Sequence, residues 1–287
     1  MGYQKISKED ELKLVEEYKN GASVSELMGR YGYKTKKSIT DKVKKYYPDE
    51  YQEIIRQAQD NRRGYTYSLS EIKSPFDAYL IGLLLTDGYL LSDRDGLGLD
   101  MVDEDVIAFI AKGIGITYKA YPQAGKQTRY RVLINRPGLQ AEAARYGIIK
   151  NKTYIIPAPQ LYEQEKRYLP YIIRGIIDGD GCVSKTSYGG AQFYIVSASE
   201  EFIKWIEKIL VENFFMEDLH IRKTEDSLYR VETANQFNIL KLIALVYNKP
   251  FGMNRKYIEI RKTFRDYNKD FFIGNNEIDG IVQTATE

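Results

Sequence analysis

The sequence has 287 residues, with 42 basic and 40 acidic side chains and a formal net charge of +2, so its overall charge does not indicate an anionic partner. A chain of this length can bury a sizeable core in one large or two moderate domains. A single cysteine and a single histidine exclude a disulfide framework, cysteine-rich zinc sites and clusters of metal-bound imidazole. No apolar signal segment opens the chain, so we expect an intracellular, cytoplasmic protein.

Residues 1–50 are predicted to form a small all-α domain. Apolar spacing and glycine breaks predict three helices, over 10–19, over 24–31, and from Thr35 or Ser38 toward Tyr47. Ser23 and Glu26 are spaced to form a capping box at the start of the second helix. The succession of helix, glycine turn, short helix, glycine turn and helix is typical of a helix-turn-helix DNA-binding domain. The alternative is a solvated three-helix bundle without a ligand.

The third predicted helix is rich in lysine, which favours DNA binding by this domain. Its candidate phosphate contacts are Lys36, Lys37, Lys42, Lys44 and Lys45. The polar stretch that follows, residues 51–73, is predicted to be a helical linker, in which a helix over 51–67 runs into a flexible tether.

Two apolar segments in the rest of the chain share one pattern. Residues 77–90 and 169–183 each contain an apolar run that is interrupted by one glycine and ends in Asp-Gly. The matching pairs, each separated by 93 residues, are Gly82 and Gly175, Asp87 and Asp180, and Gly88 and Gly181. Three equal separations indicate an internal duplication of roughly a hundred residues. We therefore predict a first repeat over 74–160, a second over 161–267, and a tail over 268–287 that carries no motif.

Each of the two segments is predicted to form a short buried helix. Ser74-Pro75 supplies the N-cap and the first-turn proline of the first helix, and Gly88 and Gly181 are natural helix stops. The apolar runs are too short to cross a bilayer, which needs about 20 residues. A glycine inside a helix costs roughly 1 kcal/mol relative to alanine, a cost that is reasonable where two backbones approach closely. We expect the two helices to pack on each other along a pseudo-twofold axis.

Such packing would bring Asp87 and Asp180 together at adjacent helix C-termini. The negative end of the helix dipole disfavours an anion there, and a second carboxylate adds to the repulsion. A bridging cation would relieve both effects, and Mg²⁺ prefers one or two carboxylates together with waters and phosphate oxygens. The alternative is that each Asp-Gly forms only a solvated turn after its helix.

The two repeats show the same order of elements. Predicted hairpins lie over 89–102, 116–135, 183–197 and 219–234, and further helices begin near Asp103 and Pro137 and cover 200–214 and 237–247. Each repeat is therefore αββαββα. The predicted fold class is α+β, with two pseudo-twofold-related repeats that carry antiparallel, saddle-shaped sheets.

The solvent faces of these sheets are candidates for DNA recognition. An antiparallel sheet commonly has one face on the helices and one in water. Candidate contacts at alternating strand positions are Lys119, Gln123, Arg129, Arg131, Gln192, Tyr194, Arg222 and Arg230. Arginine and glutamine pair bidentately with guanine and adenine in the major groove. A solvated sheet without a ligand would show the same alternation, and the sequence leaves open which register faces outward.

The segments LIGLLLTDG (residues 80–88) and IRGIIDGDG (residues 173–181) resemble the two motifs of a single-chain LAGLIDADG homing endonuclease. Each matches the central glycine and the terminal Asp-Gly of the motif. In the first copy, Leu85 stands where the motif has its sixth-position aspartate. The eighth-position aspartate, which carries catalysis in that family, is present in both copies. The resemblance covers residues 74 to about 265.

The resemblance implies a monomeric endonuclease that cuts both strands of double-stranded DNA at a long asymmetric site. The residues that would hold two or more Mg²⁺ ions are Asp87, Asp180, Gly88 and Gly181. Lys152 and Lys256 match the lysine that follows the last strand of each repeat in the family, and would orient or deprotonate the water or neutralise charge on the phosphate. Gln123 or Gln127 are further candidate water ligands. The alternative on the same fold is a non-cleaving DNA-binding regulator or an intron RNA maturase.

Overall fold

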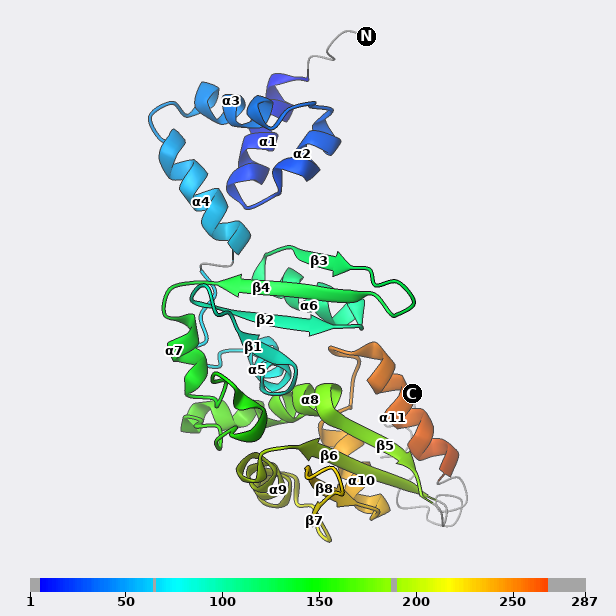
Figure 1. Cartoon of the computed structure of the whole chain (residues 1–287). Coiled ribbons are helices and arrows are strands. Elements are labelled where there is room, and N and C mark those ends of the chain that lie inside the picture. Colours follow the sequence, from blue (N-terminus) through cyan, green and yellow to red (C-terminus); the bar gives the residue numbers. More distant parts are fainter. Residues whose placement is uncertain (1–5, 64–65, 187–189, 268–287) are drawn as a thin grey trace.

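The structure is a computed structural model that describes residues 6–63, 66–186 and 190–267 (Figure 1). The N-terminal helices are α1 (Lys8–Lys19), α2 (Val24–Tyr31), α3 (Lys36–Tyr46) and α4 (Tyr51–Arg63). Ser23 and Glu26 form the predicted capping box, and the Thr35 side chain caps α3. Ile54 and Ala58 of α4 share one core with the three preceding helices, so α4 is packed on this bundle.

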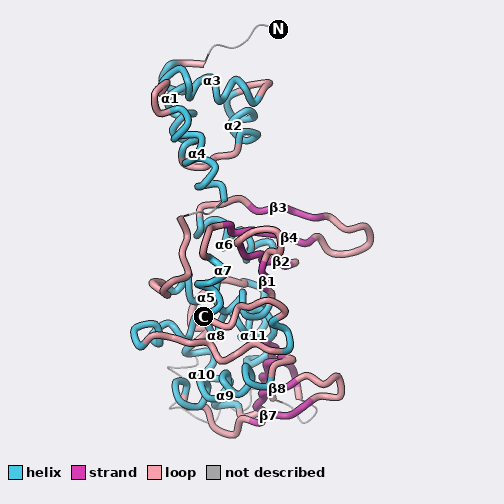
Figure 2. Tube along the Cα trace, turned by 60° about the vertical axis from the view of Figure 1, so that its left-hand side comes forward, coloured by secondary structure: helices cyan, strands magenta, loops and turns pink. Residues whose placement is uncertain are grey.

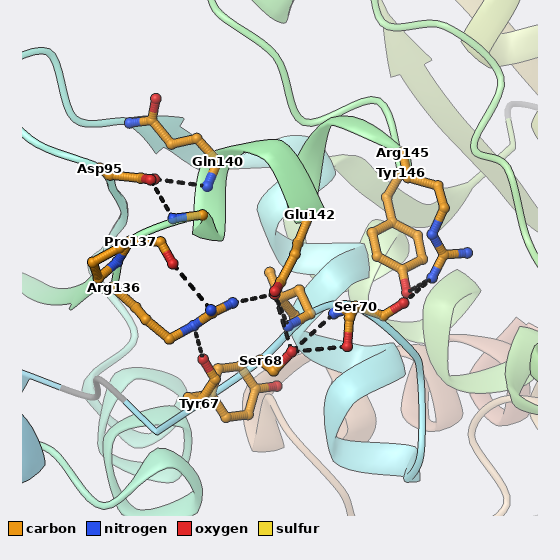
Figure 3. A network of polar contacts seen from close by, with 12 residues as sticks. Tyr67, Ser68, Ser70, Asp95, Arg136, Pro137, Gln140, Glu142, Arg145 and Tyr146 are labelled. Carbon is orange, nitrogen blue, oxygen red and sulfur yellow. Dashed lines mark hydrogen bonds and ion pairs between the residues drawn. The ribbon is translucent and has the colours of Figure 1, made fainter.

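The segment between α4 and α5 (Pro75–Thr86) is attached by side-chain hydrogen bonds to the first repeat (Figure 3) and to the turn before α8 (Leu169–Asp180). The Ser68 hydroxyl and the Leu69 N–H donate to Glu142 Oε2 over 3.1 and 2.8 Å. The Ile72 N–H donates to Glu165 Oε1 over 2.8 Å. A flexible tether was predicted here, but residues 66–74 form a strap that is fixed on the protein. Residues 64 and 65 lie outside the described residues.

The first repeat has the predicted order of elements. After α5 come β1 (Gly88–Leu90), β2 (Gly96–Met101), α6 (Glu104–Ile114), β3 (Tyr118–Tyr121), β4 (Arg129–Asn135) and α7 (Leu139–Ala144). The four strands form an antiparallel sheet in the order β1-β2-β4-β3. Leu97, Leu99, Val132 and Ile134 point from its two central strands into the core.

The second repeat has the same sheet topology, with one helix that was not predicted. Its elements are α8 (Leu169–Asp180), β5 (Gly181–Lys185), β6 (Ala191–Ser197), α9 (Glu200–Phe214), β7 (His220–Lys223), β8 (Tyr229–Thr233), α10 (Gln236–Leu245) and α11 (Asn254–Tyr267). The strand order β5-β6-β8-β7 matches that of the first sheet, which confirms the predicted fold class. Two short 3-10 turns, Lys152–Tyr154 and Glu163–Tyr168, precede α8. The predicted tail lies outside the described residues.

Helices α5 and α8 pack against each other between the two sheets, with their glycines at the contact (Figure 1). A Cβ atom at Gly82 would collide with the Ile172 carbonyl and lie 2.8 Å from the Cα of Gly175. A Cβ atom at Gly175 would lie 2.9 Å from the Cα of Gly82. The predicted close approach of two backbones is therefore present. No helix within the described segments is both long and apolar enough to cross a membrane.

The glycines that follow the two motif aspartates end the helices by a route that was not expected. Neither Gly88 nor Gly181 has the positive φ that is common at helix-ending glycines, and Gly181 is extended with φ −89°. Instead, each of the two glycines lies directly against the last turn of its helix. A Cβ atom at Gly88 would lie 2.6 Å from the Cα of Leu84, and one at Gly181 would lie 2.7 Å from the Cα of Ile177. Space, and not left-handed backbone, requires glycine at both positions.

Candidate active site

Asp87 and Asp180 lie at the C-terminal ends of α5 and α8, and each is followed directly by the first strand of its repeat. Gly179 lies against the facing helix, where an added Cβ atom would be 2.6 Å from Asp87 Oδ2. The tight glycine contact in the middle of the helices thus brings the two carboxylates to one place. Asp87 is partly buried, whereas Asp180 is more exposed.

Both carboxyl groups are harder to ionise than usual. Burial raises the pKa of Asp87, against the opposing effects of the Thr86 hydroxyl and of Lys152. Although the Asp180 residue keeps part of its surface exposed, the surrounding protein displaces water from its carboxyl group. This loss of hydration raises the pKa of Asp180 to about 6, and the charge on Asp87 contributes to that increase. Two carboxylates that disfavour each other's ionisation form a site that a cation stabilises.

The two halves of the site differ at the residue before each aspartate. The Thr86 hydroxyl lies 3.0 Å from Asp87 Oδ2 and 3.0 Å from the Leu83 carbonyl oxygen. The equivalent position in the second motif is Gly179, which has no side chain to offer Asp180. Thr86 was not identified from the sequence, although its place in the first motif was available as a signal.

Lys152 and Lys256 both reach the site, from different kinds of element. Lys152 lies in a 3-10 turn and Lys256 in α11. Lys152 Nζ donates to the carbonyl oxygens of Leu85 and Thr86 over 2.8 and 2.7 Å. Lys256 Nζ donates to the carbonyl oxygens of Ile177, over 3.1 Å, and of Gly181. Each ammonium group therefore lies at the C-terminal end of one motif helix, where a positive charge is favoured.

Burial lowers the pKa of both lysines. For Lys152, the negative charges of Asp180 and Asp87 act in the opposite direction, which indicates that its ammonium group is close to both carboxylates. For Lys256, the main opposing charge is that of Asp178. The lysines thus belong to the same polar cluster as the motif aspartates.

The donor set fits a divalent ion of the magnesium type. Among the residues that the structure describes, no three His, Cys, Asp or Glu side chains gather into a complete metal site. Mg²⁺ does not need such a set, because it takes one or two carboxylates and completes its shell with water and phosphate oxygens. Asp87 and Asp180 would supply those carboxylates at a place where their own charges repel. The Gly181 carbonyl, a predicted ligand, accepts a hydrogen bond from Lys256 and would have to share its oxygen.

The structure fixes which register of each sheet faces away from the core. Val132 and Val231 are buried, so the neighbouring Arg131 and Arg230 lie on the opposite faces. The predicted contacts that are exposed are Lys119, Gln123, Arg129 and Arg222, and those that are partly buried are Arg131, Gln192, Tyr194 and Arg230. Gln127, the other candidate water ligand, is exposed in the loop between β3 and β4.

The sequence analysis missed two acidic residues on these outer faces. Asp100 pairs with Arg131, and Glu232 pairs with Arg222 and Arg230. Their strand positions alternate with buried residues, so the same periodicity that identified the arginines was available for them.

The lysines of α3 divide into two groups. Lys36, Lys37 and Lys44 are exposed. Lys42 and Lys45 form ion pairs with Glu11 of α1, which is buried. Burial acts to raise the pKa of Glu11, but hydrogen bonds from Lys42, Lys45 and Tyr46 bring it down to about 2.

Comparison with known proteins supports the assignment of the fold. Residues 169–246, which run from α8 into the end of α10, match the model of a LAGLIDADG-like domain. The structure is similar to that of the homing endonuclease I-WcaI bound to its DNA recognition sequence, with a TM-score of 0.50 and 15% identity over 70% of this chain and 92% of that chain. No curated protein sequence matches the chain.

Two other solved structures are similar at lower TM-scores. They are the LAGLIDADG homing endonuclease I-GzeII in complex with its DNA target (TM-score 0.47, 13% identity, 75% of this chain and 97% of that chain) and the N-terminal LAGLIDADG domain of DUF199/WhiA (TM-score 0.44, 11% identity, 70% and 94%). These matches do not confirm the helix-turn-helix assignment of residues 1–50, which stays a prediction. Residues 169–246 of the second repeat thus match a LAGLIDADG-like domain, and the chain shares the two-repeat fold of I-WcaI.

Proposed function

We propose that the protein is a site-specific endonuclease that hydrolyses one phosphodiester bond in each strand of double-stranded DNA, with divalent metal ions held between Asp87 and Asp180. The observation that carries this proposal is the meeting of two motif aspartates at the adjoining ends of α5 and α8. A protein that only binds DNA has no evident need for paired anions, because they repel the phosphate backbone.

A divalent ion in this position would supply an activated water and stabilise charge on the leaving oxygen. The role of the two aspartates is to hold that ion without a complete protein shell, which leaves room for phosphate oxygens. The pKa of Asp180 is raised first by loss of hydration and second by the charge of Asp87, and a bound cation would offset both effects.

For the two lysines, the geometry favours an electrostatic role. Each Nζ donates two hydrogen bonds to carbonyl oxygens at a helix end, which hold it in place. A fixed ammonium group beside the carboxylates would attract the phosphate and stabilise negative charge as it develops. Of the roles considered for Lys152 and Lys256, neutralisation of charge is therefore the one that we propose.

The outer faces of the two sheets are the proposed DNA-reading surfaces. The side chains on them are mainly long and polar, and both faces lie on the repeats whose motif helices meet at the aspartates. Two covalently joined repeats with different side chains suit a long asymmetric duplex, and one chain then suffices for both half-sites. In the N-terminal bundle, Lys36, Lys37 and Lys44 are the proposed phosphate contacts, since Lys42 and Lys45 are paired with Glu11.

The proposal is tested by removing one carboxylate charge at a time. A target site is first selected from a randomised duplex library in the presence of Ca²⁺ and is placed in a supercoiled plasmid. We expect the wild-type chain to linearise this plasmid in Mg²⁺. Asp87→Asn and Asp180→Asn should each lower the rate of linearisation by at least about 100-fold and still bind the site in Ca²⁺, because the side-chain shape is kept and the charge is lost.

The matched control is Asp93→Asn, which removes the same charge from an exposed residue in the β1–β2 turn. It should cut at close to the wild-type rate. Cutting at the wild-type rate by either motif variant would refute the proposed site. A wild-type chain that binds its selected duplex but fails to cut it in the presence of any divalent ion would instead support the non-cleaving regulator or maturase.

A further inference from the structure

On the outer face of the first sheet, an arginine is held in an ion pair by an acidic side chain. Arg131 on β4 donates from Nε and Nη2 to the two carboxylate oxygens of Asp100 on β2, each over 2.7 Å. The Arg131 guanidinium also lies over the ring of Tyr121, 4.6 Å from its centre. The Asp100 side chain is 16% exposed, so this acid is part of the surface and not of the core.

The outer face of the second sheet also pairs an arginine with an acid and a tyrosine, here through an ion pair without the two hydrogen bonds of the first sheet. Arg230 Nε lies 2.6 Å from Glu232 Oε2, and the Arg230 guanidinium lies 3.7 Å from the centre of the Tyr194 ring. Glu232 is also 2.9 Å from Arg222 Nε and accepts a hydrogen bond from Gln192 over 3.1 Å. One carboxylate thus organises three of the predicted DNA contacts.

The two arginines are equivalent by duplication, but the two acids are not. Arg131 and Arg230 occupy the middle of Tyr-Arg-Val in β4 and β8. Asp100 faces Arg131 across the β2–β4 pair, whereas the residue that faces Arg230 across the β6–β8 pair is Val196. Glu232 comes instead from β8 itself. Two acids inherited from one ancestral repeat would occupy equivalent strand positions. Asp100 and Glu232 do not, so duplication alone does not explain why the arginine of each repeat has an acidic partner.

An acid on a surface that binds DNA has a definite physical effect. Its charge repels the phosphate backbone of any sequence, so it lowers non-specific affinity. By holding the Nε edge of the guanidinium, it also restricts the arginine to one orientation, which favours a fixed contact with a base edge over a mobile contact with phosphate. Both effects widen the difference in affinity between the correct duplex and all others.

We propose that Asp100 and Glu232 are specificity-determining residues, each of which holds the arginine of its repeat for base recognition and weakens binding to duplexes of other sequence. This inference rests on the proposed binding of DNA by the outer sheet faces. A purely structural role is the competing explanation, since an ion pair on the face of a sheet also contributes to the stability of the fold. The two explanations differ in what they predict for the affinity of the acid variants for DNA.

The test measures binding of a mixed-sequence duplex by fluorescence anisotropy, in Ca²⁺, over a series of KCl concentrations. Asp100→Asn and Glu232→Gln should each bind this duplex about three- to tenfold more tightly than the wild type. The slope of log affinity against log salt should become steeper by about 1, because one released arginine adds one phosphate contact. Affinity for the duplex selected from a library should rise less, so the ratio of specific to non-specific affinity should fall.

Two controls separate the effect of the acid–arginine ion pair from that of a simple change in net charge. Glu163→Gln removes a carboxylate from an exposed ion pair with Lys166, in the 3-10 turn before α8, and should leave both slope and ratio unchanged. In the double variant Asp100→Asn with Arg131→Gln, the gain in non-specific affinity should disappear, because the released arginine is absent.

Each remaining outcome has a clear meaning. If both acid variants match Glu163→Gln in salt slope and in the affinity ratio, the inference is overturned, including the case in which only their melting temperatures fall. If the wild-type chain binds neither duplex at low salt, the proposed function fails as well, since DNA binding itself is then absent.

Discussion

At the scale of single residues, Thr86 makes the two halves of the candidate site unequal. Its hydroxyl hydrogen-bonds Asp87, while the corresponding Gly179 leaves Asp180 without such a neighbour. Gly179 cannot readily be larger, because a Cβ atom there would collide with the Thr86 hydroxyl and with Asp87. The threonine of one motif and the glycine of the other therefore fit together, and only one carboxylate is oriented by a hydroxyl.

This difference predicts unequal cutting of the two strands when the hydroxyl is removed. Thr86→Val keeps the branched shape and should slow the cut on one strand by about tenfold, because a hydrogen bond to a charged group contributes roughly 1.5–3 kcal/mol. Nicked plasmid should accumulate, and a duplex labelled on each strand in turn identifies the slow strand. Thr86→Ser, which keeps the hydroxyl, should cut both strands at near wild-type rates. Equal slowing of both strands by Thr86→Val would contradict the orienting role.

At the scale of elements, the contact between α5 and α8 decides whether there is a site at all. α5 is apolar on nearly every face, and α8 is buried along most of its length, so periodicity alone does not orient them. Gly82 and Gly175 do so, because only at that crossing can the two backbones meet. The aspartates follow each glycine by five positions and reach the same end of the pair.

A methyl group at this crossing should separate the helices. Gly82→Ala should lower the free energy of unfolding of the repeats by about 2–4 kcal/mol, since the clash with Ile172 outweighs the roughly 1 kcal/mol that alanine gains in a helix. Gly29→Ala in α2 is the matched control, because a Cβ atom there meets nothing within 4 Å. It should stabilise the N-terminal bundle by up to about 1 kcal/mol. Urea unfolding followed by circular dichroism measures both, and equal effects would show that the crossing is not tightly packed.

Helices and strands could be predicted where the sequence itself carries a signal for them. Ser74-Pro75 is a local signal for the start of α5, and the repeat of one motif after 93 residues can be read directly from the sequence. These two features led to α5, α8 and the duplicated sheets. In α11, Tyr257, Ile260 and Phe264 have helical spacing, so a signal for this missed helix was present.

Tertiary contacts could not be predicted in this way. Asp178, at the sixth position of the second motif, is buried and accepts hydrogen bonds from the hydroxyls of Tyr79 and Tyr247, both over 2.7 Å. These partners come from α5 and from the end of α10, and no local pattern connects them. The carbonyl partners of Lys152 and Lys256 could not be predicted for the same reason. Lys152 lies in a 3-10 turn and Lys256 in α11, and the two lysines follow their aspartates at different distances along the chain.

At the scale of the whole molecule, the N-terminal bundle, the first repeat and the second repeat follow one another in a row (Figure 2). The two repeats share one continuous core through α5 and α8, whereas the bundle has a core of its own. We propose from this that the repeats unfold together and the bundle separately. The strap over residues 66–74 then determines how firmly the bundle is attached to the part that would cut DNA.

Glu165 is the residue on which that strap most depends. It is fully buried and accepts hydrogen bonds from Arg145, from the Tyr146 hydroxyl and from the N–H groups of Ile72 and Tyr162. It therefore joins the strap, the end of the first repeat and the segment that leads into α8. Burial acts to raise the pKa of Glu165, but these hydrogen bonds, first those from Arg145, bring it down to about 2.

A lowered pKa means that the ionised carboxylate stabilises the folded state at neutral pH. That contribution is present above about pH 4.5, where the unfolded chain is also ionised, and is lost as the pH falls toward about 2. Its size is about 3 kcal/mol from the difference in pKa. Glu165→Gln should therefore unfold more easily than the wild type at pH 7, and this difference should shrink steadily below pH 4.5, where the wild-type side chain becomes protonated and resembles glutamine.

Urea unfolding at a series of pH values measures the difference in the free energy of unfolding directly. A gap of constant size across that range would show that the Glu165 charge does not hold the strap, and the attachment would then have to depend on Glu142 and on the apolar contacts of Leu69 and Ile72.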